Sequence, residues 1–367
     1  MTEQNQLVLS PGAGDRTQDI AAILARFLQR FISLPVEAYI LLPIWILHTY
    51  IHNMFEFTPY LNITSPEASC GKTTTGDALT ALCHKATTPT CGTAAVLRRV
   101  IARYQPTLIL DEWDSLTLQV REACGNFLNT GFKRGGTYML FEKSTVIELS
   151  TFCPKALVGR ATVRLAEATL TRCISITIHK SAAGDKLEKF RESHRCEAEV
   201  LRQMCQQWAD EFRRKQVLVS PNFPESLDGR QQDICEVLLV IADELGGEWP
   251  KAVRKALTNL LASRQRNLHT PENELLRAVQ KYVLENKLVE FLSRDFCQWA
   301  NAQEETPWSE KSLTPLRLAN MLRVYDIYPG QINRMVSGKQ RNCRGYLVAA
   351  FQQAFDRYLE PVTSSAT

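Results

Sequence analysis

The residues with the clearest chemical meaning are Gly71, Lys72 and Thr73, which lie between an expected strand and an expected helix. In that context the backbone N–H groups and the helix N-terminus bind phosphate, the lysine reaches the β- and γ-phosphates, and the threonine hydroxyl holds Mg²⁺. The expected nucleotide-binding segment consists of Ser65, Pro66, Glu67, Ala68, Ser69, Cys70, Gly71, Lys72, Thr73 and Thr74. Pro66 stands where a general phosphate loop has glycine. The alternative interpretation is a solvated lysine at a helix start.

A second motif, an apolar strand that ends in Asp111 and Glu112, follows in the chain. Its run Leu108-Ile109-Leu110 is continuous, as at the centre of a parallel sheet. Asp111 would bind Mg²⁺ through water, and Glu112 would polarise the water that attacks the γ-phosphate. The alternative is a strand that merely ends in acidic turn residues. Together the two motifs predict hydrolysis of ATP with Mg²⁺, and Lys72, Asp111 and Glu112 are the catalytic candidates.

Helical and extended patterns alternate around both motifs and indicate an α/β fold. Apolar residues recur at helical spacing over 17–57, a stretch that Pro35 divides in two. Further helices are expected at 72–84, 94–104 and 118–129, and strands at 60–64, 107–111, 138–141, 146–152 and 173–179. From residue 230 onward the pattern is almost entirely helical.

The composition is that of an ordinary folded protein, with 45% apolar and 22% charged residues. These fractions exclude wholesale disorder and collagen-like repeats. At roughly 150 residues per domain, a chain of 367 residues allows two or three domains. The net charge of +4 permits a nucleic-acid partner without requiring one.

The cysteines, histidines and apolar runs argue against several other classes of protein. The eleven cysteines include no CxxC pair, so we expect buried reduced thiols rather than a zinc or dithiol site. His48 and His52 have no third ligand in view, and we assign them to packing. The most apolar run, 39–47, contains Pro43 and is about half as long as a membrane span requires. We therefore expect a cytoplasmic protein without a membrane partner.

Motifs spread along the chain resemble those of one family. They are Thr64-Ser65-Pro66-Glu67, Cys70-Gly71-Lys72-Thr73-Thr74, Pro106-Thr107-Leu108-Ile109-Leu110-Asp111-Glu112, Leu128-Asn129-Thr130-Gly131, Thr169-Leu170-Thr171-Arg172, Gly229-Arg230-Gln231-Gln232-Asp233, Ile241-Ala242-Asp243 and Arg344-Gly345-Tyr346. Over residues 20–360 the chain is similar to the uncharacterised P-loop ATPase domain of phage, plasmid and other mobile-element replication proteins, which is often found downstream of a primase domain. Ser-Pro-Glu is usual in that family, so Pro66 departs from the general loop and not from the family.

The resemblance implies an additional-strand, AAA+-like P-loop NTPase of the helicase-like group that assembles into rings. The expected organisation is an N-terminal helical segment at 1–57, an ATPase core with a parallel sheet at 58–220, an all-helical lid at 225–285 and a small winged-helix-like domain at 286–367. Winged helices often bind duplex DNA. One that makes only protein contacts is the alternative.

The same resemblance implies roles for three further residues. The strand 146–151 would come after the Asp-Glu strand, and Thr151 at its tip would sense the γ-phosphate, with Ser150 as the alternative one residue away. Arg172 would be an arginine finger that acts on the ATP of a neighbouring subunit, or a helix-end arginine that pairs with a local carboxylate. Arg230 would contact the γ-phosphate of its own subunit, or pair with a carboxylate on its own helix.

The loop 131–136 and the β-rich stretch after it form the expected nucleic-acid contact. Lys133 and Arg134 follow Phe132 between glycines, which suits phosphate contacts combined with base stacking. Lys143 would lie at a hairpin tip that lines the pore of a ring. The alternative is an ordinary surface turn.

These expectations combine into a ring-forming ATPase, expected to be a hexamer, that acts as a helicase-like motor on single-stranded or forked DNA in phage or mobile-element replication. The alternative is an ATP-driven loader or switch that binds DNA and a replication partner, such as a primase or polymerase, without unwinding. A third hypothesis is a nucleotide-binding scaffold without hydrolysis, against which the intact Lys72, Asp111 and Glu112 argue.

Overall fold

The chain forms two compact units, 1–262 and 263–367. The computed structural model describes residues 19–67, 69–89, 93–142, 144–161, 163, 165–181, 186–215, 220–266, 271–303, 312–336 and 339–359. Ala68 and Lys143 of the expected site lie outside these ranges, as does Cys91.

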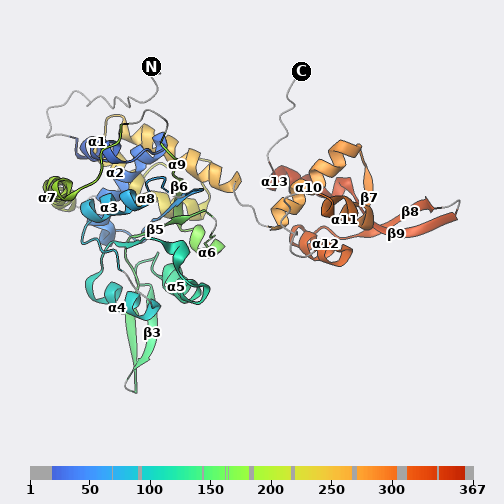
Figure 1. The fold of residues 1–367 in the computed structure, drawn as a ribbon, viewed down its shortest axis with the longest axis horizontal. Coiled ribbons are helices and arrows are strands. Elements are labelled where there is room, and N and C mark those ends of the chain that lie inside the picture. Colours follow the sequence, from blue (N-terminus) through green and yellow to red (C-terminus); the bar gives the residue numbers. More distant parts are fainter. Residues whose placement is uncertain are drawn as a thin grey trace. The chain divides into compact units, whose positions relative to one another are not determined.

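A four-stranded parallel sheet forms the centre of the first unit (Figure 1). Its strands are β1 (Tyr60–Ser65), β2 (Leu108–Leu110), β5 (Lys155–Arg160) and β6 (Cys173–Thr177), in the order β2-β5-β1-β6. The strands are short apolar runs with almost all residues buried, as expected for strands that helices cover on both faces. The mixed α/β class predicted from the sequence is therefore confirmed.

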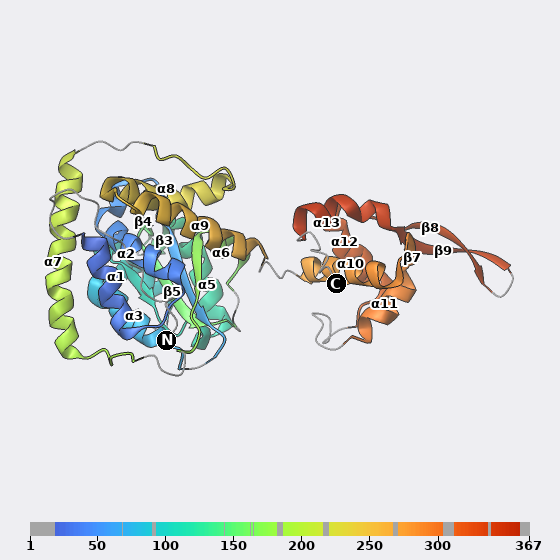
Figure 2. The same ribbon diagram turned by 90° about the horizontal axis from the view of Figure 1, so that it is seen from above.

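Helices from both ends of the first unit pack into one core with this sheet. They are α1 (Ile20–Phe31), α2 (Val36–Ile51), α3 (Lys72–Leu82), α7 (Glu192–Lys215), α8 (Gly229–Leu245) and α9 (Trp249–Arg266). Pro35 is the N-cap of α2, so the division predicted there is confirmed. The long helix α7 runs along one side of the unit, in contact with α1, α2 and α3 (Figure 2). Residues 20–51 therefore belong to the same core as the sheet.

A two-stranded hairpin projects from the first unit (Figure 1). It consists of β3 (Thr137–Glu142) and β4 (Thr145–Ser150), which are antiparallel, and its base lies beside α4 (Ala94–Tyr104) and α5 (Leu118–Thr130). The expectation that 146–151 is the sheet strand after the Asp-Glu strand is wrong, because β5 fills the place between β1 and β2. The residues of β4 are exposed or half-buried, with Thr145, Val146 and Ile147 β-branched, which suits a hairpin strand. The continuous apolar run Ala156-Leu157-Val158 suits a buried parallel strand.

Histidines and cysteines of the first unit serve in packing. His48 and His52 are buried on or just after α2; burial lowers the pKa of His48 well below its usual range and the pKa of His52 to about 4. Both rings are therefore neutral at physiological pH. Across both units, the ten described cysteines form no disulfide with one another, and eight of them are buried, as predicted.

No helix within the described ranges has both the length and the apolar character needed to cross a membrane.

The second unit has its own core, built around Phe291, Phe296, Tyr346 and Phe351. Its elements are α10 (Pro271–Asn286), β7 (Glu290–Leu292), α11 (Ser293–Asn301), α12 (Pro315–Leu322), β8 (Gly330–Val336), β9 (Lys339–Leu347) and α13 (Gln352–Tyr358). The three strands form an antiparallel sheet in the order β7-β9-β8. Because α10 packs in this core, the lid predicted at 225–285 is divided between the two units.

Short elements complete the fold. They are α6 (Glu167–Leu170) and the 3-10 helices η1 (His52–Met54), η2 (Trp113–Ser115), η3 (Arg323–Tyr325) and η4 (Val348–Phe351).

Candidate functional site

The loop between β1 and α3 begins at the carboxyl end of a central strand and ends at a helix N-terminus. Gly71, the residue before α3, has φ +92°, a backbone conformation that favours glycine. A Cβ atom there would lie 3.8 Å from Ile32 Cγ2, an ordinary contact, so the conformation rather than crowding requires the glycine. The strand-loop-helix context predicted for phosphate binding is therefore present.

Lys72 is folded back over this loop. Its Nζ donates a hydrogen bond to the Glu67 carbonyl (3.0 Å) and another to Ser65 Oγ. Thr73 is exposed at the first turn of α3, while Cys70 is buried. The ammonium group thus occupies the mouth of the loop, where an anion bound to the backbone N–H groups would meet it.

Asp111 and Glu112 follow β2 at the same edge of the sheet. The Glu112 N–H donates to Asp111 Oδ1 (2.8 Å), and Glu112 has φ +51°, so the chain turns sharply between the two carboxylates. Burial raises the pKa of Asp111, and the charges of Glu112, Asp77 and Asp114 add to this effect, while the hydrogen bond from Glu112 opposes it. Several carboxylates lie close together here, and a bound divalent cation would reduce the repulsion between their negative charges.

These residues converge on one cleft of about 320 Å³, here called the acidic cleft. Its lining includes Lys72, Thr73, Asp111, Glu112, Asp114 and Arg160. Within the described part of the chain, no group of three or more His, Cys, Asp or Glu is arranged to hold a metal by itself. A hydroxyl, one carboxylate, water and substrate phosphates fit Mg²⁺, which keeps part of its water shell and rarely uses an all-protein cage.

Arg160 is a site residue that the sequence interpretation missed. It ends β5, and the register places it opposite Ser65 at the start of the phosphate loop. Its N–H donates to Asp114 Oδ1 (3.0 Å), and its Nε lies 3.8 Å from Asp114 Oδ2. The signal was present, because Ala156-Leu157-Val158-Gly159 after Pro154 is a buried strand pattern that ends in a basic residue.

Thr151 does not lie at this site. It precedes β5 at the amino ends of the strands, where Lys155 is paired with Leu108. Its buried hydroxyl donates to the Gly136 carbonyl (3.1 Å) and lies 3.0 Å from Thr130 Oγ1. Ser150, the alternative, ends β4 of the hairpin. The position predicted for Thr151, at the tip of the strand beside β2, is held by Arg160.

Arg172 and Arg230 lie together at the amino edge of the sheet. The Arg172 carbonyl accepts from the N–H of Tyr60, the first residue of β1. The guanidinium carbons of both arginines lie 5.7 and 5.6 Å from the ring centre of Phe132. Burial and the charge of Arg230 lower the pKa of Arg172.

The expected contact of Arg230 with the γ-phosphate of its own subunit is therefore wrong. Arg230 lies 3.8 Å from Asp233 on its own helix, which is the alternative interpretation. Arg172 also lies at the edge opposite the phosphate loop of its own subunit, and its Nη1 donates to the Ala168 carbonyl.

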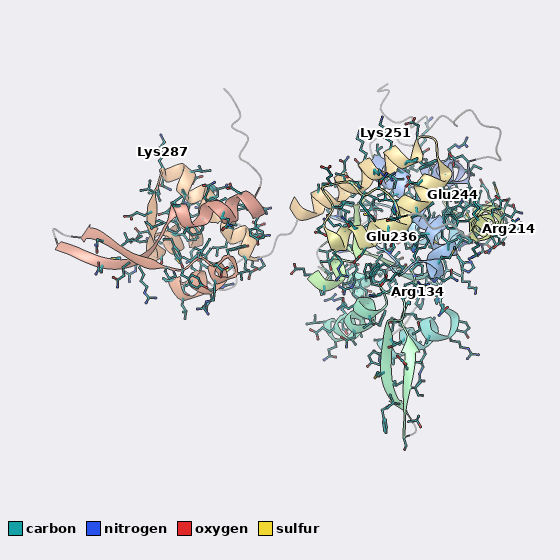
Figure 3. The ribbon with its side chains drawn as sticks, turned by 180° about the vertical axis from the view of Figure 1, so that it is seen from behind. Arg134, Arg214, Glu236, Glu244, Lys251 and Lys287 are labelled. Atoms are coloured by element: carbon teal, nitrogen blue, oxygen red, sulfur yellow. The ribbon has the colours of Figure 1, made fainter. Side chains whose placement is uncertain are left out.

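Lys133 and Arg134 lie at the base of the hairpin (Figure 3 labels Arg134). Lys133 Nζ is 2.8 Å from Glu56 Oε1, and the Arg134 guanidinium donates to the Asn53 carbonyl (3.2 Å). These contacts attach the loop 131–136 to the segment before β1. On the hairpin itself, three large apolar side chains are exposed, namely Met139, Phe141 and Val146. Cross-strand pairing places all three on one face.

Comparison with known proteins gives a family match for about half of the chain. Residues 177–358 match the model of a family described as "Protein of unknown function (DUF3631)". This range is just under half of the chain, and it begins after the phosphate loop and the Asp-Glu motif.

One curated relative and two solved structures are also similar to the chain. The relative is an "Uncharacterized 28.9 kDa protein in xis 5'region" from Saccharopolyspora erythraea, 28% identical over 142 residues, or 38% of this chain and 51% of that protein. The chain thus spans about half the length of that relative. The structures are "The A form apo structure of NrS-1 C terminal region-CTR" (13% identity, TM-score 0.45, 94% of this chain and 79% of that one) and its 305-718 form (14%, 0.42, 94% and 78%).

Asp111→Asn should raise the free energy of unfolding at neutral pH when nucleotide and metal are absent. The pKa of Asp111 is raised in the folded protein, so ionising this carboxyl costs more free energy in the folded state than in the unfolded state. Above that pKa the charge of Asp111 therefore lowers the free energy of unfolding, and the neutral amide removes this penalty. The gain should shrink as the pH falls through the raised folded-state pKa, and it should vanish below the ordinary aspartate pKa of about 3.9, where both states are protonated. Urea denaturation in EDTA across this pH range measures it.

Asp356→Asn, an exposed aspartate in α13, is the matched control and should show no such gain. A loss of stability in Asp111→Asn at neutral pH would contradict the electrostatic account of the acidic cleft.

Proposed function

We propose that this chain is a Mg²⁺-dependent ATP hydrolase of the additional-strand, AAA+-like P-loop class. The observation that carries the proposal is the convergence of Lys72, Thr73, Asp111 and Glu112 on one cleft at the carboxyl edge of a parallel sheet. The strand order supports the class, because β5 lies between the phosphate-loop strand β1 and the Asp-Glu strand β2. An inserted strand at that place is what distinguishes additional-strand enzymes.

Each residue of the acidic cleft has a definite role in this proposal. The backbone of the loop and Lys72 bind the β- and γ-phosphates, and Thr73 and Asp111 hold the cation, which neutralises charge on the phosphate oxygens. Glu112 accepts a proton from the attacking water. Arg160, at the tip of the strand between the two motifs, replaces Thr151 as the residue that contacts the γ-phosphate.

Glu112→Gln should abolish turnover while ATP binding persists. Loss of a positioned general base lowers kcat by about 10²- to 10⁴-fold, and the amide removes the base without changing the size of the side chain. Steady-state phosphate release and equilibrium binding of ATP measure the two effects. Glu122→Gln, an exposed glutamate in α5, is the control and should retain wild-type turnover. Unchanged turnover in Glu112→Gln would remove Glu112 from the mechanism and favour a non-hydrolysing scaffold.

The proposal extends to a ring, expected to be a hexamer, in which ATP binds between subunits. Arg172 lies at the edge opposite the phosphate loop of its own subunit, so it can reach a phosphate only in another subunit. Its Nε is buried without a hydrogen-bond partner among the described residues, and its pKa is lowered by burial and by Arg230. Both observations describe a cation that a neighbouring anion would stabilise. Arg230, beside it, would face the same neighbour.

Mixing two inactive variants tests this arrangement. Lys72→Ala and Arg172→Ala should each be inactive alone, while an equal mixture should recover activity at about a quarter of the interfaces, since each interface takes the loop from one subunit and the arginine from the next. A mixture of Lys72→Ala with Glu112→Gln is the control. Both of its lesions lie on the same side of the interface, so it should stay inactive. If the mixture of Lys72→Ala and Arg172→Ala shows no ATP turnover, Arg172 does not act on the ATP of a neighbouring subunit.

We further propose that the ring acts on DNA during replication of a phage or other mobile element. The biological setting rests on the motif resemblance. The hairpin β3–β4 supports a DNA contact, because it carries exposed Met139 and Phe141 and is braced by Arg98, whose guanidinium carbon lies 4.0 Å from the ring centre of Tyr138. In the second unit, helix, strand, two helices and the β8–β9 hairpin follow in the order of a winged helix, which supports a second DNA contact.

Phe141→Ala should weaken binding of single-stranded DNA by about 5- to 150-fold, which corresponds to the loss of one aromatic stacking contact. Fluorescence anisotropy with a labelled oligonucleotide measures the affinity. Val200→Ala, an exposed apolar residue on α7, is the control and should bind DNA like the wild type. Equal affinities for Phe141→Ala and wild type would remove the hairpin from the DNA contact.

A loader or switch is the second candidate function, and one observation favours it. Lys133 forms an ion pair with Glu56, and Arg134 donates a hydrogen bond to the Asn53 carbonyl. The exposed side chains that the described part of the hairpin offers are therefore apolar rather than basic. An apolar hairpin also suits a protein partner such as a primase or polymerase. Strand separation on a forked duplex distinguishes the motor, which unwinds it, from a loader, which hydrolyses ATP without unwinding.

A further inference from the structure

Asp114 is a carboxylate of the acidic cleft to which the proposed hydrolysis assigns no role. It lies in η2, two residues after Glu112, and its side chain is 21% exposed. Its Oδ1 accepts a hydrogen bond from the Arg160 N–H (3.0 Å), and its Oδ2 lies 3.8 Å from Arg160 Nε. Both side chains line the cleft. One carboxylate therefore contacts both the backbone and the side chain of the residue that is proposed to contact the γ-phosphate.

Close packing of η2 against the end of β5 positions this carboxylate. A Cβ atom on Gly159 would lie 2.8 Å from Asp114 Oδ1 and 3.3 Å from the Asp114 backbone nitrogen, so the glycine leaves room for the approach. The Asp114 carbonyl accepts a hydrogen bond from Arg121 Nη1 of α5 (3.3 Å). The N–H and the hydroxyl of Ser115 both donate to the Glu112 carbonyl (2.8 Å each). The turn that carries Glu112 and Asp114 is thus held against β5 before any ligand binds.

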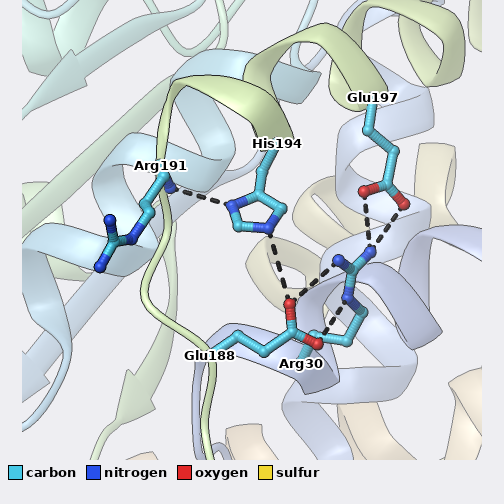
Figure 4. Close-up of polar contacts among 5 residues, drawn as sticks. All are labelled: Arg30, Glu188, Arg191, His194 and Glu197. Carbon is cyan, nitrogen blue, oxygen red and sulfur yellow. Dashed lines mark hydrogen bonds and ion pairs between the residues drawn. The ribbon is translucent and has the colours of Figure 1, made fainter.

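The guanidinium of Arg160 is held much less firmly than its backbone. The side chain is 55% exposed, and among the described residues the contact of 3.8 Å with Asp114 is its only ion pair. Arg30 shows the opposite case (Figure 4). It donates from Nη1 to both oxygens of Glu197 (2.7 and 2.8 Å), and from Nε and Nη2 to Glu188 (3.2 and 3.1 Å). Bidentate pairs fix a guanidinium, whereas one exposed pair contributes little. The Arg160 side chain can therefore leave Asp114 at a small cost in free energy.

We propose that Asp114 is a positioning residue that holds the Arg160 guanidinium in the cleft without ATP and releases it to the γ-phosphate when ATP binds, an inference that rests on the proposed ATPase function. The carboxylate and the γ-phosphate are both oxygen anions, and they compete for one guanidinium. The γ-phosphate carries more charge and wins. ADP has no γ-phosphate, so Arg160 stays with Asp114. After hydrolysis the carboxylate takes the guanidinium back, which weakens the hold on the cleaved phosphate.

The two contacts of Asp114 can be separated by substitution. An asparagine keeps the size of the side chain and an oxygen that accepts a hydrogen bond from the Arg160 N–H, but it has no charge to attract the guanidinium. Asp114→Asn therefore leaves the end of β5 attached to η2 and removes only the competition for Arg160. Because the competitor is gone, the γ-phosphate no longer has to displace a carboxylate, and ATP should gain affinity relative to ADP.

Asp114→Asn should raise the preference for a non-hydrolysable ATP analogue over ADP by about two- to fivefold, the change that corresponds to the loss of one exposed ion pair. Titration calorimetry on the full chain with Mg²⁺ gives the dissociation constants of both nucleotides. Asp77→Asn is the matched control for charge. Asp77 also raises the pKa of Asp111, but it pairs with Arg195 (3.5 Å) rather than with Arg160. Its removal should change both affinities in proportion and leave their ratio unaltered.

A double-mutant cycle with Arg160→Ala shows whether Asp114 acts through Arg160. Arg160→Ala alone should lower the preference for the ATP analogue, and adding Asp114→Asn should then change the ratio no more than Asp77→Asn does. An unchanged or lowered preference in Asp114→Asn, or an equal rise with and without Arg160, would overturn the exchange of Arg160 and leave the proposed ATPase intact. Wild-type protein that binds neither the analogue nor ADP would overturn the proposed ATPase as well.

Discussion

The parallel arrangement of β2, β5, β1 and β6 is the constraint on which the rest of the structure depends. Parallel strands end at the same edge of a sheet, so the phosphate loop after β1, the carboxylates after β2 and Arg160 at the end of β5 must meet. The hydrogen-bonded register determines which residues lie side by side at this edge, because Ser65 lies opposite Arg160 and Leu110 lies opposite Leu157. A slip of one residue in either ladder would turn these side chains to the other face.

The parallel arrangement also places a second set of side chains, among them Lys155, at the amino ends of the strands. Lys155, fully buried at the start of β5, donates to the carbonyls of Thr151 (2.9 Å) and Cys153 (3.0 Å) and to Tyr60 Oη (3.1 Å). Burial lowers its pKa, yet these oxygens satisfy the ammonium group without a carboxylate. The Gly131 carbonyl lies 3.4 Å away, and a Cβ on Gly131 would overlap the Thr151 carbonyl at 2.0 Å. The hairpin base is therefore anchored on the sheet.

The sequence predicted those parts of the site whose signal is local. Lys72 and Asp111 each sit within a short motif flanked by the element that positions it, so both strand and loop could be identified. β5 was missed because the β-branched hairpin strand before it has the stronger propensity, and propensity does not distinguish a hairpin from a buried parallel strand. Arg230 was misplaced because its surroundings depend on Phe132, which is distant in sequence. The local sequence around Lys133 does not show its ion pair, because its partner Glu56 precedes β1 and is distant in the chain.

The separation of the two edges bears on how hydrolysis would reach the hairpin in the proposed ring. Arg160 and Lys155 end the same strand, but β5 is bonded on both sides to β1 and β2, so it transmits movement only if the whole sheet shifts. Arg172 would couple the nucleotide site to the hairpin through fewer contacts. It contacts Phe132, in the loop that leads into the hairpin, and it would face the neighbouring subunit's phosphates. A change in that neighbour's nucleotide would then act at the hairpin base directly, and the subunit interface rather than the sheet would carry the coupling.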